Sequence, residues 1–386
     1  MTAAAGLSVL HDRAHELVDP CLRLLEALVT VESPSADVDR NLRVAARLRS
    51  ELELRGVSVE RHPAHGYGEH LVARVEGESS ARAPLLVIGH MDTVYAVGTL
   101  TQVPFAIEAA NDRVCGPGTY DMKGGLAVAI TALDLLSLVG RRPAGDLLFL
   151  ITCDEELGSP TSRGLIEEHA RGARGALVLE PPVPGGAAKT RRKGVGWFRV
   201  SVRGRPAHAG IEPETGASAV HELIQILEDI RLLADADKGT TLNVGVIEGG
   251  TRANVVAELA RADIDLRFWD AAEADRVERA LRSVRAGDPR CALSVEGGVN
   301  RGSLEVTEAS AALFARAHEV ATAQGWDLAE GSTGGASDGN LASAVGCPTL
   351  DGLGPDGGGA HSLDEHVRLS DIAPRIAFLA GMFLRF

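Results

Sequence analysis

The chain of 386 residues is longer than one hydrophobic core usually organises, so its length favours two domains. Apolar residues make up 45% of the chain and charged residues 24%, which excludes a disordered or fibrous protein. The formal net charge of −14 argues against a nucleic-acid partner, because binding to phosphates needs clustered Lys and Arg.

The N-terminal stretch MTAAAGLSVLHDRAHELVDP has no basic start followed by a sustained apolar run, so we expect that it is not a secretory signal. Apolar runs in the sequence are shorter than a membrane span, which predicts no membrane partner. The five cysteines are scattered and have no CxxC spacing, as expected of reduced thiols. Together these features predict a cytoplasmic protein.

Up to about residue 180, helix-like and strand-like segments alternate. Residues 17–31 and 41–56 have helical spacing, whereas residues 84–90, 146–153 and 175–180 are short aliphatic runs typical of buried strands. This alternation predicts an α/β domain with helices packed on a central, mostly parallel sheet.

Residues 194–301 follow a different pattern. A strand, a helix, two strands, a helix and a strand are expected at residues 196–204, 215–233, 241–250, 253–269, 271–287 and 291–299. The order β-α-β-β-α-β is that of ferredoxin-like domains. Because the first pattern resumes after about residue 305, we expect a small domain inserted into a larger one formed by residues 1–193 and 302–386.

Polar side chains stand where the predicted strands of the larger domain end. His90 ends the strand at 84–90, and Asp92 lies two residues further on. In an open α/β sheet, ligands gather at the carboxyl ends of strands, which makes this position informative. A single histidine after a strand is nevertheless more often packed or solvated than bound to a metal.

Carboxylates occupy two further positions of this kind. Asp154, Glu155 and Glu156 directly follow the strand at 146–153, where adjacent like charges repel one another unless a cation is present. Glu180 ends the next strand. Asp121 lies in a glycine-rich turn before a helix, where it either caps the helix or binds a ligand.

His361, in a glycine-rich loop near the C-terminus, adds a second imidazole to this set. Imidazole and carboxylate ligands together suit Zn²⁺, with Co²⁺ or Mn²⁺ as alternatives. The set is large enough for two ions that share a bridging aspartate. A metal site is therefore the leading hypothesis.

The motifs GHMDTV, GPGTYDMKGG, TCDEELGS, LEPP, GRPAHAG and GGGAHS occur in this order and resemble the M20 family of dinuclear zinc peptidases and deacylases. The resemblance spans about residues 20–380 and is strongest to the glutamate carboxypeptidases of that family. It implies that the larger domain is a zinc-peptidase catalytic domain and that the inserted one is a dimerisation (lid) domain. One zinc ion would be held by His90, Asp121 and Glu180, and the other by Asp121, Glu156 and His361.

The same resemblance implies roles for residues beside the ligands. Asp92 would orient the ring of His90, and Glu155 would be the general base that takes a proton from water. Asp154, the third acid of that run, matches no family role.

The inserted domain carries three further matching residues. His208 would reach across from a partner subunit of a homodimer to stabilise the oxyanion, although by itself it is typical of a loop histidine. Asn254 and Arg267 would contact the substrate. Arg267 falls on the polar side of its strand, so it either binds a substrate carboxylate or forms a surface ion pair.

The expected reaction is therefore hydrolysis of an amide bond in a small peptide or N-acyl amino acid. We expect a carboxypeptidase that releases a C-terminal glutamate-like residue. An N-acyl-amino-acid deacylase is the alternative enzyme, and a catalytically inactive, metal-stabilised binding protein is disfavoured because no ligand and no base is missing. Residues 334–340 and 362–367 depart from the family pattern, and these departures bear on substrate choice.

Overall fold

The structure, a computed structural model, describes residues 3–386; residues 1 and 2 of the expected catalytic domain lie outside the described residues. The chain divides into two compact units. The first comprises Met1–Arg191, Val306–Thr333 and Ser337–Phe386, and the second Arg192–Glu305 with Gly334–Ala336. The inserted domain expected over residues 194–301 falls inside the second unit.

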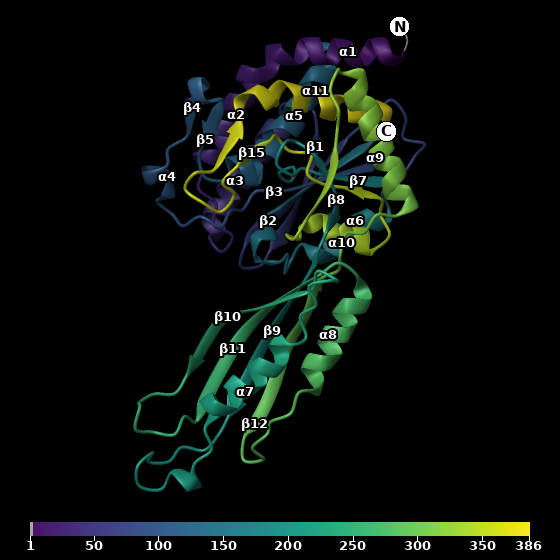
Figure 1. Ribbon diagram of the computed structural model, residues 1–386. Helices are drawn as coiled ribbons and strands as arrows, with labels where there is room; N and C mark the ends of the chain where they lie inside the picture. The colour runs from purple at the N-terminus through teal and green to yellow at the C-terminus, as the bar shows by residue number, and fades with distance from the viewer. Residues whose placement is uncertain (1–2) are drawn as a thin grey trace. The chain divides into compact units, whose positions relative to one another are not determined.

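A six-stranded sheet runs through the part of the first unit that the structure describes (Figure 1). Its strands, in spatial order, are β1 (Ser58–Ala64), β2 (Gly68–Val75), β6 (Leu147–Thr152), β3 (Leu85–His90), β7 (Gly175–Val178) and β14 (Thr349–Leu350). The pairs β6–β3, β3–β7 and β7–β14 are parallel, whereas β1–β2 and β2–β6 are antiparallel. The predicted α/β class is confirmed, and the sheet is mixed because β1 and β2 add an antiparallel edge.

Helices cover both faces of this sheet, so its central strands are buried on both sides. Leu85 and Val87 of β3 join the core cluster that also contains α5, whereas Leu86 and Ile88 join a cluster with α6 and α10. The bounds of these helices are α5 (Gly124–Leu138), α6 (Arg163–Arg171) and α10 (Asp338–Ala344). A strand buried on both faces reads as a continuous aliphatic run, which is the signal that predicted β3, β6 and β7.

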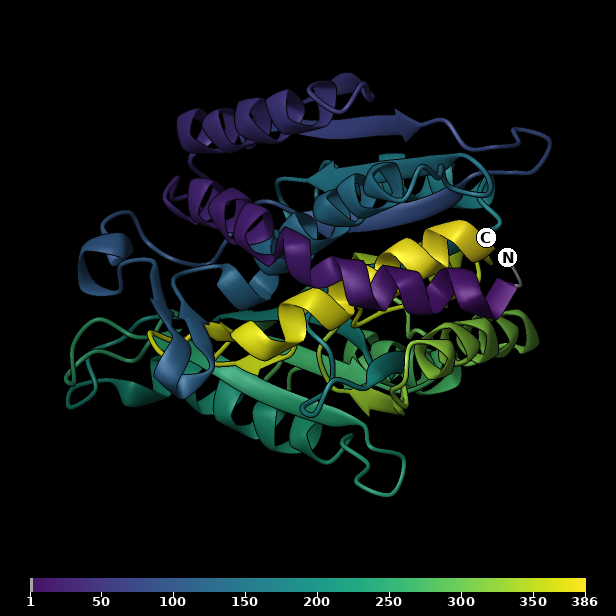
Figure 2. The same ribbon diagram turned by 90° about the horizontal axis from the view of Figure 1, so that it is seen from above.

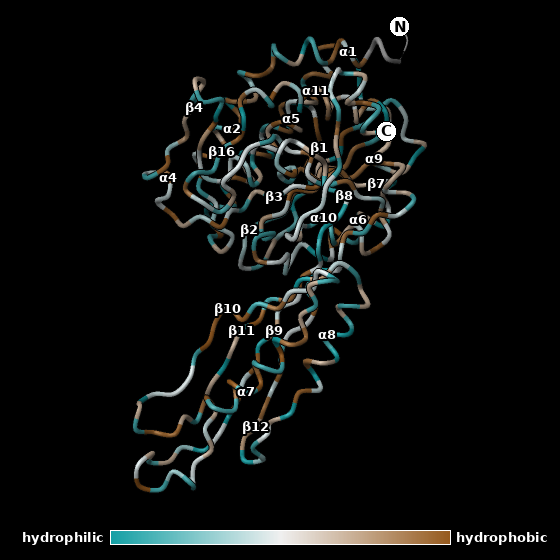
Figure 3. Tube along the Cα trace, viewed as in Figure 1, coloured by the Kyte–Doolittle hydropathy of each residue, from teal (hydrophilic) through white to brown (hydrophobic). Residues whose placement is uncertain are grey.

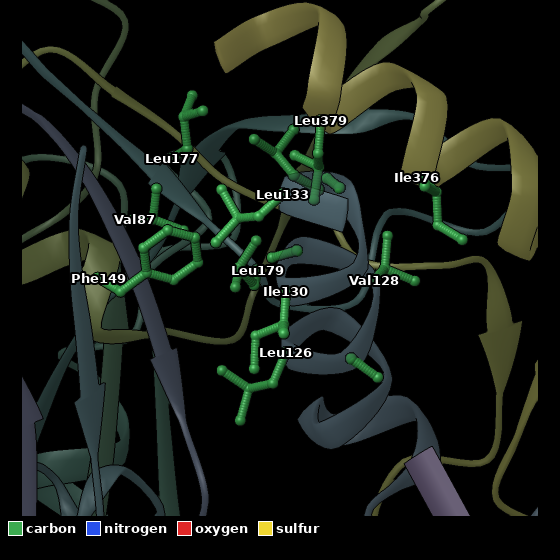
Figure 4. Close-up of a cluster of buried hydrophobic side chains, with 14 of the residues drawn as sticks. Val87, Leu126, Val128, Ile130, Leu133, Phe149, Leu177, Leu179, Ile376 and Leu379 are labelled. Atoms are coloured by element: carbon green, nitrogen blue, oxygen red, sulfur yellow. The ribbon is translucent and has the colours of Figure 1, made fainter. Parts of the chain in front are cut away.

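The larger core cluster joins the sheet to α5 and to a layer of helices from both ends of the chain. These outer helices are α1 (Ala3–Ala14), α2 (Val18–Val29), α3 (Val38–Glu53), α9 (Glu308–Ala323) and α11 (Leu369–Arg385). In Figure 4, side chains of the strands meet those of α5 and α11, among them Val87, Phe149, Leu177, Leu126, Ile130 and Leu379. The N-terminal and C-terminal helices, α1 and α11, lie side by side in Figure 2.

Short elements complete the first unit. They are α4 (Thr99–Gln102), β4 (Ala106–Glu108), β5 (Arg113–Cys115), β8 (Ala188–Arg192), β13 (Glu330–Thr333), β15 (Gly357–Gly358) and β16 (His366–Arg368). The strands β15, β16, β5 and β4 form a small sheet in that order, and β13 pairs with β8. Across residues 3–386, no helix combines the length and the apolar composition needed to cross a membrane.

The second unit is a four-stranded antiparallel sheet with two helices. Its elements along the chain are β9 (Gly194–Arg203), α7 (Ala219–Arg231), β10 (Thr241–Gly249), β11 (Leu259–Phe268), α8 (Ala271–Ser283) and β12 (Ala292–Arg301). The spatial order β10-β11-β9-β12 is that of a ferredoxin-like domain, as predicted. Teal and brown segments are interspersed along α8 in Figure 3, because charged residues stand between apolar ones.

One predicted strand of the second unit begins later than expected. The expectation placed it over residues 253–269, whereas β11 starts at Leu259. The main chain before β11 pairs instead with the loop that contains His208, since the amide of Val256 donates to the carbonyl of Ala207 (3.0 Å). The prediction was therefore wrong for residues 253–258, whose apolar valines belong to this loop pairing.

Candidate metal centre

Three adjacent parallel strands deliver the predicted ligands to one edge of the central sheet. His90 is the last residue of β3 and is in register with Thr152, the last residue of β6. Glu155 and Glu156 follow β6, and Glu180 follows β7, the other neighbour of β3. The carboxyl ends of parallel strands form the usual ligand-binding edge of such sheets.

The side chains at this edge form two groups that share Asp121. The Nε2 atom of His90 lies 3.1 Å from Oδ1 of Asp121 and 3.5 Å from Oε1 of Glu180. The Nε2 atom of His361 lies 3.4 Å from Oδ2 of Asp121 and 3.3 Å from Oε2 of Glu156. The two oxygens of Asp121 therefore face two different imidazoles.

This donor set fits divalent ions. Nitrogen and oxygen ligands about 2.0–2.2 Å from a tetrahedral Zn²⁺ lie about 3.3–3.6 Å from one another. The four distances above, 3.1–3.5 Å, are close to that spacing. Candidate ligand atoms lie within 4.8 Å of one another in two sets, one formed by His90, Glu155 and Glu180 and the other by His90, Asp121 and Glu156.

The side chains of this cluster compete for protons, since their pKa values are shifted by burial and by contacts with one another. Hydrogen bonds with Asp121 and Glu156 raise the pKa of His361 to about 10. Burial opposes a charge on His90, but its bonds to neighbouring carboxylates outweigh burial and hold its pKa well above the ordinary value. Burial raises the pKa of Glu156 to about 7. A metal ion that binds here must displace such protons.

Asp92 lies between His90 and the run of acids after β6. Its carboxylate is fully buried, with Oδ1 3.4 Å from Nδ1 of His90, and its carbonyl oxygen lies 3.0 Å from the same nitrogen. The carboxylate also accepts hydrogen bonds from the amides of Glu155 (3.3 Å) and Glu156 (3.2 Å) and from the hydroxyl of Ser35 (2.6 Å). Asp92 thus contacts both the imidazole and the main chain of the two glutamates.

Two of the predicted site residues of the second unit, His208 and Asn254, lie on segments that pair with each other. The amide of Ala209 donates to the carbonyl of Asn254 (3.1 Å), and His208 is bridged to Val255. The Nδ1 atom of His208 accepts a bond from the amide of Gly210 (3.1 Å). The pairing brings the segments of His208 and Asn254 together, and both residues are exposed.

Arg267 forms an ion pair within its own strand. Its Nε and Nη2 atoms lie 2.7 and 2.9 Å from the two carboxylate oxygens of Asp265. Of the two expectations for Arg267, the structure shows the surface ion pair. Contact with a substrate stays a prediction.

Residues 86–385 match the sequence model of "Peptidase family M20/M25/M40". The chain belongs to the M20 family. It is similar to carboxypeptidase G2 of Pseudomonas sp. (strain RS-16), at 30% identity over 387 residues, which cover 98% of this chain and 92% of that protein. It is also similar to acetylornithine deacetylase of Myxococcus xanthus, at 31% identity over 284 residues, 69% of this chain and 72% of that protein.

Solved structures of peptidases share the fold of this M20 chain. The crystal structure of aminopeptidase PepT from Bacillus cereus ATCC 10987 superposes with a TM-score of 0.78 at 22% identity, covering 95% of this chain and 98% of that one. The expected resemblance and fold are thus confirmed. The protein is an M20 metallo-hydrolase of amide or peptide bonds, and this family implies a dinuclear metal site.

Two buried residues of this M20 enzyme support the centre without having been assigned a role from sequence. Asp154 accepts hydrogen bonds from the amide (2.7 Å) and hydroxyl (2.6 Å) of Thr161 and from the hydroxyl of Ser162 (2.6 Å), so it anchors the turn after Glu155 and Glu156. Lys123 donates from Nζ to the carbonyls of Leu28 (3.0 Å) and Val31 (2.9 Å), and its burial lowers its pKa to about 7. No sequence pattern singled out Lys123, which lies two residues after Asp121.

The helix-capping alternative for Asp121 is not what the structure shows. The turn Thr119–Lys123 precedes α5, and Lys123 occupies the N-cap position. Within the described chain, no side chain caps this helix by a hydrogen bond. The carboxylate of Asp121 instead faces His90 and His361, which leaves it available to a ligand.

Proposed function

We propose that this M20 enzyme is a two-metal carboxypeptidase that releases a C-terminal acidic residue such as glutamate from a peptide or N-acyl conjugate. The proposal of hydrolysis rests on the position of Asp121. Its two oxygens face His90 and His361, beside Glu155. The preference for an acidic residue rests on the resemblance to glutamate carboxypeptidases.

The proposed ligands are His90, Asp121 and Glu180 for one ion and Asp121, Glu156 and His361 for the other. Zn²⁺ suits these nitrogen and oxygen donors, and Co²⁺ or Mn²⁺ suits them as well. Ions held by these residues would supply Lewis-acid polarisation of the substrate carbonyl and would acidify water.

Glu155 is the proposed general base. Its carboxylate is buried, and one oxygen lies within 4.8 Å of ligand atoms of His90 and Glu180. In this role Glu155 takes a proton from the attacking water and then gives it to the leaving nitrogen, so that one residue serves both proton transfers. Asp92 contacts both the main chain of Glu155 and the ring of His90, so it fixes the position of one relative to the other.

The second unit is the proposed dimerisation domain of a homodimer. His208 of one subunit would donate a hydrogen bond to the oxyanion formed in the active site of the other. Asn254, on the paired segment, would contact the substrate, and Arg267 would bind its carboxylate as a fork. A cytoplasmic location is part of the same proposal and is supported by the five cysteines, which are free thiols.

A second candidate is an N-acyl-amino-acid deacylase, which the similarity to acetylornithine deacetylase favours. Both candidates hydrolyse an amide by the same chemistry and differ in which side of the bond they recognise. We would incubate the zinc-loaded protein with N-acyl glutamates, dipeptides and N-acetyl amino acids and follow amine release. Release of free glutamate from the first two sets supports the carboxypeptidase. Hydrolysis confined to N-acetyl amino acids supports the deacylase, and no hydrolysis of any set contradicts both.

A further inference from the structure

Glu365 reaches the metal centre from a separate part of the chain. It directly precedes β16, which pairs antiparallel with β5 so that His366 faces Cys115. This register places Glu365 beside the turn that follows β5, and the amide of Gly116 donates to the carbonyl of Glu365 (3.3 Å). The same loop carries His361 four residues earlier. His361 has a φ of 61°, a left-handed backbone conformation that residues other than glycine rarely adopt.

The side chain of Glu365 is buried, with 1% of its surface exposed. Its Oε1 atom accepts hydrogen bonds from the amides of Tyr120 and Asp121, each at 2.8 Å, and its Oε2 atom accepts one from Gly118 at 2.8 Å. One carboxylate thus binds three amides of a single turn. A buried charge is costly unless its oxygens are bonded, and here the turn provides the donors.

The bonds to Glu365 fix the main chain that carries the shared ligand. Asp121 has φ of −119° and ψ of 92°, which are not helical values, so helical hydrogen bonds do not set its conformation. Glu365 binds the amide of Asp121 itself and the amides of Tyr120 and Gly118 before it. A shift of this main chain would move both oxygens of Asp121 relative to His90 and His361.

We propose that Glu365 is a positioning residue that holds Asp121 in the orientation needed to bridge two metal ions. This inference rests on the proposed two-metal function. Loss of the contact is expected to weaken metal binding more than substrate binding.

The exchange of Glu365 for glutamine removes one acceptor and keeps the size. A glutamine amide has one oxygen that accepts and a nitrogen that only donates, so at least one of the three turn amides would face a donor. Loss of a residue that orients a metal ligand typically weakens metal affinity about 10- to 100-fold. We expect Glu365→Gln to weaken binding by this factor, to lower kcat and to leave KM nearly unchanged.

Asp364 offers a matched control, because it is the neighbouring acid on the same loop and its side chain is 75% exposed in an ion pair with Arg113. Metal-free wild type, Glu365→Gln and Asp364→Asn would be titrated with Zn²⁺ against a chelator. The visible spectra of their Co²⁺ forms and the Tm values of their metal-free forms would be recorded. A weaker dissociation constant and an altered Co²⁺ spectrum in Glu365→Gln alone support the proposal.

A purely structural role would lower the Tm of metal-free Glu365→Gln and leave its metal affinity and Co²⁺ spectrum as in wild type, which would overturn the proposal. If Glu365→Gln does not fold, hydrogen exchange in the metal-free wild type decides. The amides of Gly118, Tyr120 and Asp121 should then be protected, and exchange at the rate of open loops overturns the proposal. A wild type that binds fewer than two ions contradicts the proposed function instead.

Discussion

Two groups of carboxylates, one in each unit of this enzyme, have different counter-ions. At the candidate metal centre of the first unit, Asp121 and Glu156 are paired with the imidazoles of His90 and His361. At the start of α8 in the second unit, Glu273 is paired with Arg276 and Lys238 instead.

The distances and pKa values reflect this difference. The carboxylate oxygens of Glu273 lie 2.7 Å from Nη2 of Arg276 and 2.7 Å from Nζ of Lys238. Hydrogen bonds with these permanent cations lower the pKa of Glu273 to about 2. Burial raises the pKa of Glu156 to about 7, although His361 acts in the opposite direction. A carboxylate paired with Arg or Lys has a permanent counter-ion. A carboxylate beside a protonated imidazole loses its counter-ion when the imidazole gives up its proton, and a metal ion can then take that place.

The same contrast applies to the residues proposed for catalysis. The candidate ligands and Glu155 come together within the first unit from elements far apart in sequence. His208, Asn254 and Arg267 of the second unit lie at or near its surface, and Arg267 already has Asp265 as its partner. The candidate residues of the first unit therefore lie close to one another, whereas His208 and Asn254 of the second unit are exposed.

Removal of the metal tests the first side of this contrast and has the largest expected effect. Dialysis against a chelator should abolish amide hydrolysis, and added Zn²⁺ or Co²⁺ should restore it, because water is not acidic enough at neutral pH without the ions. Amine release and elemental analysis would be measured on the same samples. Full activity in a preparation that contains no metal would rule out the two-metal interpretation.

Glu155→Gln should leave the cation site intact and remove the base. We expect kcat to fall by about 10²–10⁴ from the lost proton transfer, while two metal ions remain bound. Metal content and turnover must be determined together, with Asp364→Asn as the control. Loss of metal from Glu155→Gln would mean that Glu155 is a ligand, as its place near His90 and Glu180 also permits.

His208→Ala tests the second side of the contrast. Removal of an oxyanion donor typically costs about 2.7–4 kcal/mol of transition-state stabilisation, which corresponds to about 10²–10³ in kcat. Because His208 lies in the second unit, bound metal should not change. An unchanged kcat would show that His208 is an ordinary loop histidine.

Mixed dimers extend this test to the partner subunit. One chain would carry His208→Ala and the other Glu155→Gln, so that under the proposed trans arrangement one composite site has both defects and the other has none. Random mixing should then recover up to about a quarter of wild-type activity. Mixed dimers that form without any recovery would contradict the proposal that His208 acts in trans.

Much of the first unit could be predicted because its strands are buried on both faces. The aliphatic runs that became β3, β6 and β7 end at His90, at the acids after Cys153 and near Glu180, so the ligand edge followed from strand ends alone. The approach of Asp121 and His361 to that edge came from the family resemblance. Periodicity carries no information about such loops.

Side-chain directions within a turn could not be predicted in this way. Asp154, Glu155 and Glu156 are adjacent and alike, and only the bonds of Asp154 to Thr161 and Ser162 show which of them anchors the turn. The neighbours Asp364 and Glu365 are a second such case, since the first is exposed and the second is buried.

The partner of Arg267, by contrast, was predictable. Residues two apart on a strand share a face, so the alternation that placed Arg267 on the polar side of β11 also placed Asp265 beside it.

The smallest expected effect concerns the stability of the second unit. It tests whether the charge of Glu273, paired with Arg276 and Lys238, stabilises the fold. Because the pKa of Glu273 is lowered to about 2, its ion pairs stabilise the fold above the ordinary glutamate pKa of about 4.3, and this contribution is lost as pH falls through the folded value. Glu273→Gln should therefore lower the free energy of unfolding at pH 7 by about 1.5–3 kcal/mol, because hydrogen bonds to charged groups contribute about that much. Urea unfolding at pH 7 and near pH 2 should show a difference between wild type and variant that shrinks in acid, with bound metal and kcat unchanged at pH 7. A difference that stays constant with pH would mean that packing, and not the charge on Glu273, stabilises the start of α8.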